Sequence, residues 1–100
     1  MNNTFGLSER TINELLEYFK SKPEIELVKI YGSRAKGTFH KGSDIDFAIL
    51  SDDSEYFYRI SAELDSLSTP YKYDIINYKT LSHLGMKKSI DNDGVIFYKR

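Results

Sequence analysis

The spacing of apolar residues near the start of the chain predicts an amphipathic helix. Four of them recur at i, i+3, i+4 and i+7, the pattern of one helix face: Ile12, Leu15, Leu16 and Phe19. Ser8 is a favourable N-cap for this helix. Because Pro23 disfavours helical backbone in the residue before it, we expect the helix to end within Ser21-Lys22-Pro23. Residues 1–6 are expected to form a loose N-terminus.

Four later segments are rich in β-branched and aromatic residues and predict strands at 25–31, 44–50, 71–78 and 95–99. The Gly-rich, polar stretch 32–43 predicts a loop with room for a helical turn. Candidate N-caps at 51–54 precede a helix that we expect to run to about Leu67. A weaker helix is expected from Thr80 to Ile90. The DNDG sequence at 91–94 predicts a turn before the last strand.

The predicted order is therefore α, β, β, α, β, α, β. We expect an α/β (α+β) fold in which a mixed sheet carries helices mainly on one face, while the other face stays open. A chain of 100 residues has room for one domain, so residues 1–100 are expected to form a single unit.

Composition removes several functional classes. The chain has 14 Lys and Arg against 15 Asp and Glu, so its formal net charge of −1 gives no support for duplex DNA binding. The absence of Cys excludes disulfides, Cys-ligated zinc and thiol catalysis, and it fits a protein of the reducing cytoplasm. The longest apolar run, residues 47–50, is too short to cross a membrane.

Candidate chemistry is concentrated in the middle of the chain. Asp44 and Asp46 are two residues apart in a predicted strand, so both side chains point to one face, with Cα atoms about 6.5–7 Å apart. Two carboxylates this close repel each other, and a bound Mg²⁺ would relieve the repulsion. By itself, an Asp-x-Asp pattern is more often a solvated strand edge.

A second candidate feature is Gly32-Ser33, which directly follows the first predicted strand. Gly permits a tight turn, and Ser33 could cap a helical turn whose free N–H groups would meet an anion. Arg34, Lys36 and Lys41 add positive charge nearby. A solvated surface loop is the simpler interpretation of this segment alone. A P-loop is excluded, because Thr38 stands where that motif requires Lys.

Together these features form a recognisable pattern. Gly32-Ser33, ten residues, and then Asp44-x-Asp46 resembles the signature of the DNA-polymerase-β-like nucleotidyltransferase superfamily. The strings GSRAKG and SDIDFAI are similar to those of its smallest branch, the minimal nucleotidyltransferase (MNT) domain proteins. Such families have a third carboxylate on a later strand, and Asp74 in YKYDIINY is the candidate here.

The resemblance implies a reaction and a set of site residues. AMP would pass from ATP to a hydroxyl with release of pyrophosphate, and two Mg²⁺ ions would assist. Asp44 and Asp46 would bind both ions, and Asp74 would bind the ion that activates the acceptor hydroxyl. The residues implied to bind the nucleotide are Gly32, Ser33, Arg34, Lys36 and Ser43.

The resemblance also implies a partner. Proteins with this pattern are commonly the antitoxin of a two-gene module whose toxin, encoded nearby, is a small helical HEPN-domain protein. The antitoxin would neutralise the toxin by adenylylating one of its tyrosines. Two alternatives stay open: a non-catalytic binding module that blocks its partner by occlusion, and a transferase that acts on a small molecule such as an aminoglycoside.

Overall fold

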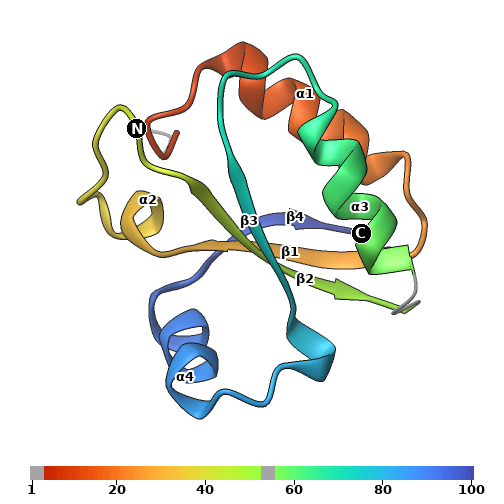
Figure 1. The fold of residues 1–100 in the computed structure, drawn as a ribbon, viewed down its shortest axis with the longest axis vertical. Helices are drawn as coiled ribbons and strands as arrows, with labels where there is room; N and C mark the ends of the chain where they lie inside the picture. The colour runs from red at the N-terminus through yellow and green to blue at the C-terminus, as the bar shows by residue number, and fades with distance from the viewer. Residues whose placement is uncertain (1–3, 53–55) are drawn as a thin grey trace.

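The computed structural model describes residues 4–52 and 56–100 and shows a four-stranded sheet in the order β3-β2-β1-β4 (Figure 1). The strands are β1 (Ile25–Tyr31), β2 (Ile45–Ser51), β3 (Tyr73–Asn77) and β4 (Val95–Lys99). β1 pairs antiparallel with both β2 and β4, whereas β2 pairs parallel with β3. The predicted mixed sheet is therefore confirmed. Each predicted strand is present, with ends that differ by at most two residues.

The helices also follow the predicted order, with one addition. They are α1 (Glu9–Lys20), α2 (Ser33–Lys36), α3 (Tyr56–Asp65), α4 (Leu84–Asp93) and the 3₁₀ helix η1 (Tyr78–Thr80). α1 begins as expected, since the Ser8 side chain accepts a hydrogen bond from the Thr11 N–H. The N-cap candidates at 53 and 54 lie outside the described residues. No helix in the described part of the chain has the length and apolar character needed to cross a membrane.

The turn predicted at 91–94 is wrong, because Asp91–Asp93 belong to α4. The helix ends at Gly94, whose N–H donates to the carbonyl of Ile90 at 2.8 Å. Ile90 is fully buried in a small cluster with Tyr31 and Ala48 of the sheet. This contact anchors the last turn of α4, and tertiary packing thereby overrides the turn composition.

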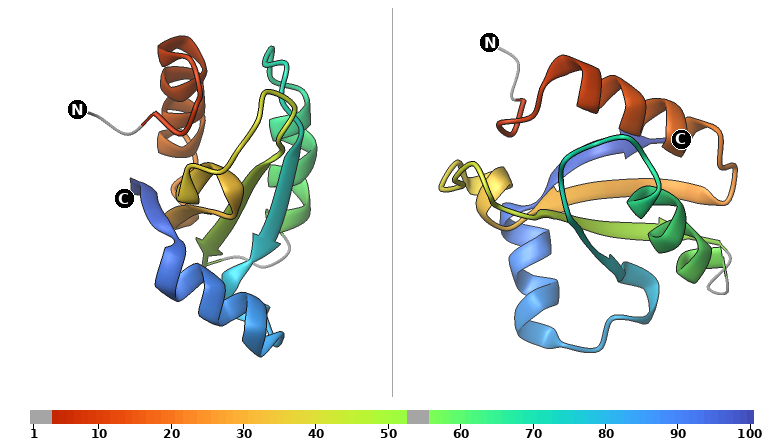
Figure 2. Two further views of the ribbon diagram at one scale, coloured as in Figure 1. Left: turned by 90° about the vertical axis from the view of Figure 1, so that its left-hand side faces the viewer. Right: turned by 45° about the horizontal axis from the view of Figure 1, so that its top comes forward.

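The main core lies between the sheet and two helices. Alternate residues of β2, at 45, 47 and 49, are fully buried and pack with Leu15 and Phe19 of α1 and with Ile60 and Leu64 of α3. α4 lies on the opposite side of the sheet from α1 (Figures 1 and 2). The expected bias of the helices to one face is thus present, and α4 covers part of the other face.

Residues 4–6 of the N-terminal segment are held against the core, contrary to the expectation of a loose terminus, and residues 1–3 lie outside the described residues. Phe5 is 7% exposed and belongs to the core, where its ring lies 6.1 Å from that of Phe97. The Leu7 N–H closes a turn by donating to the Thr4 carbonyl at 2.8 Å. One apolar side chain in a polar stretch gives no periodic signal, so the pattern along the chain could not reveal this contact.

Substitution of Phe5 tests how firmly this segment is held. We expect Phe5→Ala to lower the free energy of unfolding by about 2–4 kcal/mol, because it empties a buried site in the core. The exposed Thr4→Ala is the matched control, and we expect it to change stability by less than about 0.5 kcal/mol. Urea denaturation followed by circular dichroism measures both. Equal stability of Phe5→Ala and the unmodified chain would show that the segment does not contribute to the core.

Candidate functional site

The side chains of Tyr31, Asp46 and Asp74 form a row across the sheet, on the face opposite the main core. In the strand register, Asp46 of β2 pairs with Tyr31 of β1 on one side and with Asp74 of β3 on the other. Asp44 precedes β2 and shares the face of Asp46, because the two residues are separated by one position. The structure therefore places Asp46 directly beside Asp74, with Asp44 near enough to act on the charge of Asp46.

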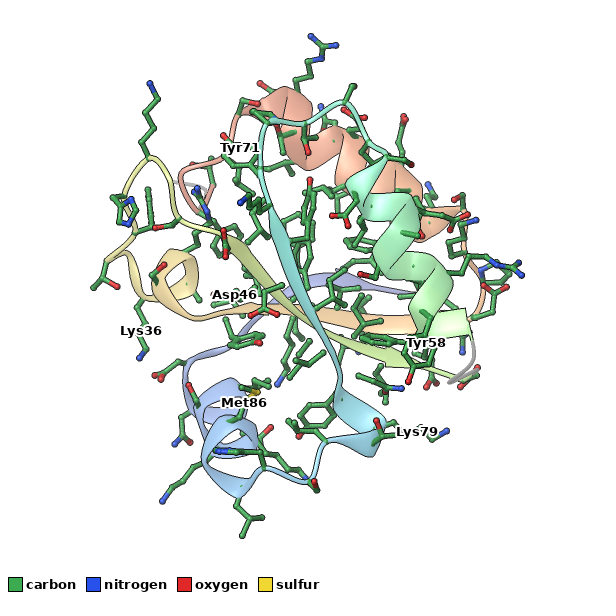
Figure 3. All side chains as sticks on the ribbon, in the orientation of Figure 1. Lys36, Asp46, Tyr58, Tyr71, Lys79 and Met86 are labelled. Carbon is green, nitrogen blue, oxygen red and sulfur yellow. The ribbon has the colours of Figure 1, made fainter. Side chains whose placement is uncertain are left out.

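The turn after β1 fits closely around one of these carboxylates. Gly32 has a φ of +75°, in the left-handed region, and a Cβ atom placed on it would overlap the Asp46 carboxylate. Only Gly satisfies both conditions. The backbone of the Gly32-Ser33 turn thus lies directly beside Asp46, which Figure 3 shows between α2 and β3.

Electrostatic strain is concentrated on Asp46. Burial raises the pKa of this carboxyl from 3.8 to about 6, and the charges of Asp74 and Asp44 contribute to the rise, while Arg34 opposes it. Burial, with the same Asp74 and Asp46, raises the pKa of the Tyr31 phenol to about 12. A site that raises the pKa of a carboxyl in this way is prepared to receive positive charge.

The carboxylates at this site suit a metal ion that takes its remaining ligands from water and substrate oxygens. Among the described residues, no group of three or more His, Cys, Asp or Glu side chains is placed to hold a metal ion. Asp44 and Asp74 are exposed, and Asp46 is partly buried. Mg²⁺ is bound in this manner in many phosphate sites, by one or two carboxylates together with water and substrate oxygens. The residues therefore fit an open magnesium site rather than a closed protein cage.

Ser33 does not cap α2, contrary to the expectation from sequence. Gly32 is the N-cap residue, no side chain makes a capping bond, and Ser33 is the first residue of the helix. The short helix closes at Gly37, whose N–H donates to the Ser33 carbonyl. Ser33 therefore directly follows the Gly32 position that lies against Asp46.

Arg34 is not placed at the surface of a phosphate site. Its side chain is 2% exposed, and the guanidinium donates to the Phe5 carbonyl at 2.9 Å and twice to the Ser43 carbonyl, at 2.9 and 3.3 Å. The guanidinium carbon also lies 5.2 Å from the ring centroid of Phe39 and 5.0 Å from that of Tyr71. These contacts tie the N-terminal turn, the 38–44 loop and the start of β3 to one buried cation.

Two other residues expected to bind nucleotide also have partners within the protein. Lys36 forms an ion pair with Asp93 at 3.6 Å and extends toward α4 (Figure 3). The Ser43 hydroxyl accepts a hydrogen bond from the His40 N–H at 2.9 Å. The structure thus holds Gly32 and Ser33 beside the carboxylates, whereas Arg34, Lys36 and Ser43 shape the surrounding loop and its contact with α4.

Two residues near the site were missed by sequence reasoning. Tyr31 is the register partner of Asp46, and Lys72 lies two positions before Asp74 on the same face of the chain. The Ile45 N–H donates to the Lys72 carbonyl at 2.9 Å, which fixes Lys72 beside Asp44. The alternation of side chains along a strand, counted back from Asp74, would have identified Lys72 as a residue of the same face. The pairing of Tyr31 with Asp46 required the register between strands.

Comparisons with known proteins identify the family of this chain. The profile of the family described as "Polymerase beta, Nucleotidyltransferase" matches residues 13–100. A protein adenylyltransferase, MntA of Shewanella oneidensis, is 34% identical over 67 residues, which cover 60% of this chain and 47% of that protein. The chain therefore spans about half the length of this curated relative.

Solved structures give the same result for the fold. A toxin–antitoxin structure with AMP-PNP superimposes with a TM-score of 0.69 at 25% identity, covering 94% of this chain and 75% of the other. A tri-AMPylated Shewanella oneidensis HEPN toxin in complex with MNT antitoxin gives a TM-score of 0.68 at 16% identity, covering 94% and 74%. The second similarity bears on the fold alone.

The raised pKa of Asp46 predicts that this residue destabilises the metal-free fold at neutral pH. Its folded pKa of about 6 exceeds its ordinary value of 3.8, so the free energy of unfolding falls as pH rises from about 4 to about 6 and is level above. We expect Asp46→Asn to be more stable than the unmodified chain at pH 7.5 by about 1–2 kcal/mol, after discounting for solvent screening. The gain should shrink at pH 4.5.

Urea denaturation in the presence of a chelator measures this difference at the two pH values. Asp65→Asn, an exposed substitution on α3, is the matched control and should show no such pH-dependent gain. A gain of the same size for Asp46→Asn at pH 4.5 and 7.5 would contradict the assignment of the effect to the carboxylate charge.

The buried contacts of Arg34 predict energetic coupling with Tyr71. We expect Arg34→Met and Tyr71→Leu each to destabilise the protein, the first by about 2–4 kcal/mol because it removes the buried hydrogen bonds from the guanidinium to the Phe5 and Ser43 carbonyls. The stability loss of the double variant should be about 1 kcal/mol smaller than the sum of the two single losses, because the cation–π contact can be lost only once. A double-mutant cycle from urea unfolding measures the coupling. Additive losses would contradict a direct contact.

Proposed function

The chain belongs to the polymerase β nucleotidyltransferase family, and on this premise we propose that it transfers AMP from ATP to a hydroxyl group and releases pyrophosphate. The observation that carries the proposal is the row of carboxylates across β2 and β3, in which Asp46 lies next to Asp74 and shares its face with Asp44. Burial first, and then the charges of Asp74 and Asp44, raise the pKa of Asp46, so the other two carboxylates lie within electrostatic reach of it.

Each carboxylate has a role in the proposed reaction. Asp44 and Asp46 would hold Mg²⁺ ions against the phosphates, and Asp74 would hold the ion nearer the acceptor. Two bound ions would neutralise charge on the attacking and leaving oxygens. Asp74, which is exposed, would also accept the proton that leaves the acceptor hydroxyl.

The turn after β1 would bind the phosphates. The Gly32 backbone lies against Asp46, so a phosphate held by a metal at Asp46 would also meet the Gly32-Ser33 turn. The Ser33 hydroxyl and the backbone N–H groups at this turn supply hydrogen-bond donors. Positioning and charge neutralisation would then account for most of the catalysis.

We further propose that the acceptor is a tyrosine of a HEPN-domain toxin and that this protein is the antitoxin. The curated relative is named a protein adenylyltransferase, and similar structures are toxin–antitoxin complexes, one of them with AMP-PNP. These names support ATP as the donor and a protein as the acceptor. A cytoplasmic location fits the same proposal, because the chain contains no Cys and its donor substrate is ATP.

Incubation with ATP labelled at the α- or the γ-phosphate, in the presence of Mg²⁺ and the product of the neighbouring gene, tests this function. We expect the α label, and not the γ label, to appear on the partner, on a tyrosine identified by mass spectrometry. Asp44→Asn and Asp46→Asn should each reduce transfer by at least about 100-fold, because each removes a charge that would hold the metal. Transfer should also stop when Mg²⁺ is chelated.

Three outcomes would contradict the proposal. Transfer of the γ label would make the protein a kinase. Neutralisation of the partner by the folded Asp44→Asn/Asp46→Asn variant would show that occlusion is sufficient. Labelling of an aminoglycoside in place of the partner protein would indicate a small-molecule transferase.

A further inference from the structure

The cations near the site fall into two groups. Arg34 is buried against carbonyls and rings, and Lys36 is paired with Asp93, so neither is available to a ligand without losing contacts. Within residues 4–52 and 56–100, Lys41 and Lys72 form no ion pair, and both are exposed. The positive charge that remains free is therefore on the 38–44 loop and on the segment just before β3.

Both free lysines line the same pocket. Its volume is about 230 Å³, and its wall consists of Lys41, Gly42, Ser43, Asp44, Pro70, Tyr71 and Lys72. Asp44 thus belongs both to the carboxylate row and to this pocket. The pocket extends the candidate site to the side on which Lys41 and Lys72 line the same wall as Asp44.

The fold fixes the walls of this pocket. The hydrogen bond from the Ile45 N–H to the Lys72 carbonyl holds the start of β3 beside Asp44. On the other wall, Arg34 holds the Ser43 carbonyl with two donors and stacks on Tyr71. The backbone on both sides of the pocket is therefore fixed, and only the long lysine side chains need to order when a ligand binds.

We infer that the polyphosphate end of the nucleotide occupies this pocket, with Lys41 and Lys72 contacting its β- and γ-phosphates. The inference rests on the proposed function and adds two phosphate-binding residues to it. A polyphosphate bound through a metal at Asp44 would bring several negative charges into the pocket that both lysines line. The nucleobase fits less well, because Arg34 already covers one face of Tyr71, the only aromatic ring in the wall.

This placement gives the lysines a role in the transfer step. The acceptor oxygen forms a bond to the α-phosphorus while the bond from that phosphorus to the bridging oxygen of the β-phosphate breaks. The electron pair of the broken bond stays on pyrophosphate, and the hydroxyl proton leaves to Asp74. Lys41 and Lys72 would stabilise the negative charge that accumulates on the leaving pyrophosphate.

Binding measurements with three probes test the inference. Lys41→Met and Lys72→Met are titrated by calorimetry with ATP, inorganic pyrophosphate and AMP, each with Mg²⁺, and Lys20→Met on α1 is the matched control. We expect each site variant to bind ATP and pyrophosphate about tenfold more weakly and AMP as well as the unmodified protein. Lys72→Arg should retain most of the affinity, because it keeps the charge. Unchanged thermal melting shows that the variants are folded.

Other results would overturn the inference. Equal weakening for AMP and ATP would place the nucleoside end in the pocket, and unchanged binding of all three probes would leave the lysines without a ligand. A failure of the proposed function is distinguishable, since it would appear as binding of ATP without any transfer of the α label. In that case, a lysine-dependent affinity for pyrophosphate would still support this pocket.

Discussion

Strand β2 imposes the alternation on which both the core and the site depend. Residues 45, 47 and 49 are buried on one face, so the intervening positions must face the other side. Pairing with β1 and β3 then places Asp46 between Tyr31 and Asp74. A slip of one residue in either pairing would both expose the apolar side chains and disperse the row. The same packing that stabilises the fold therefore fixes the register of the carboxylates.

The candidate site lowers the free energy of unfolding of the protein at neutral pH. Asp46 is partly withdrawn from water next to two other acidic groups, and its pKa rises to about 6 as a result. The buried guanidinium of Arg34 offsets part of this repulsion and also joins three segments around the site. A rigid loop beside an electrostatically strained strand is an arrangement suited to a ligand that carries both metal and phosphate.

Much of this arrangement could be predicted from local pattern. Strand alternation placed Asp44 and Asp46 on one face, and Ser8 and Pro23 marked the limits of α1. The predictions that were wrong depend on contacts between residues that are distant in the sequence. Phe5 is buried because Phe97 and Arg34 meet it, and 91–93 are helical because Ile90 packs on the sheet. The predicted role of Arg34 could not be checked from sequence, since the sequence alone does not show whether an Arg side chain is buried or lies at the surface.

The pairing of β1 with β4 has a consequence for how the chain is made. β1 is an inner strand of the sheet, yet one of its neighbours is formed by residues 95–99. Phe97 of β4 also contacts the rings of Phe19 and Phe47 in the main core. During synthesis, β1 and these rings therefore lack these neighbours until residues 95–99 have emerged from the ribosome. A nascent chain that stops short of β4 therefore leaves one side of β1 unpaired and leaves Phe19 and Phe47 without their contact to Phe97.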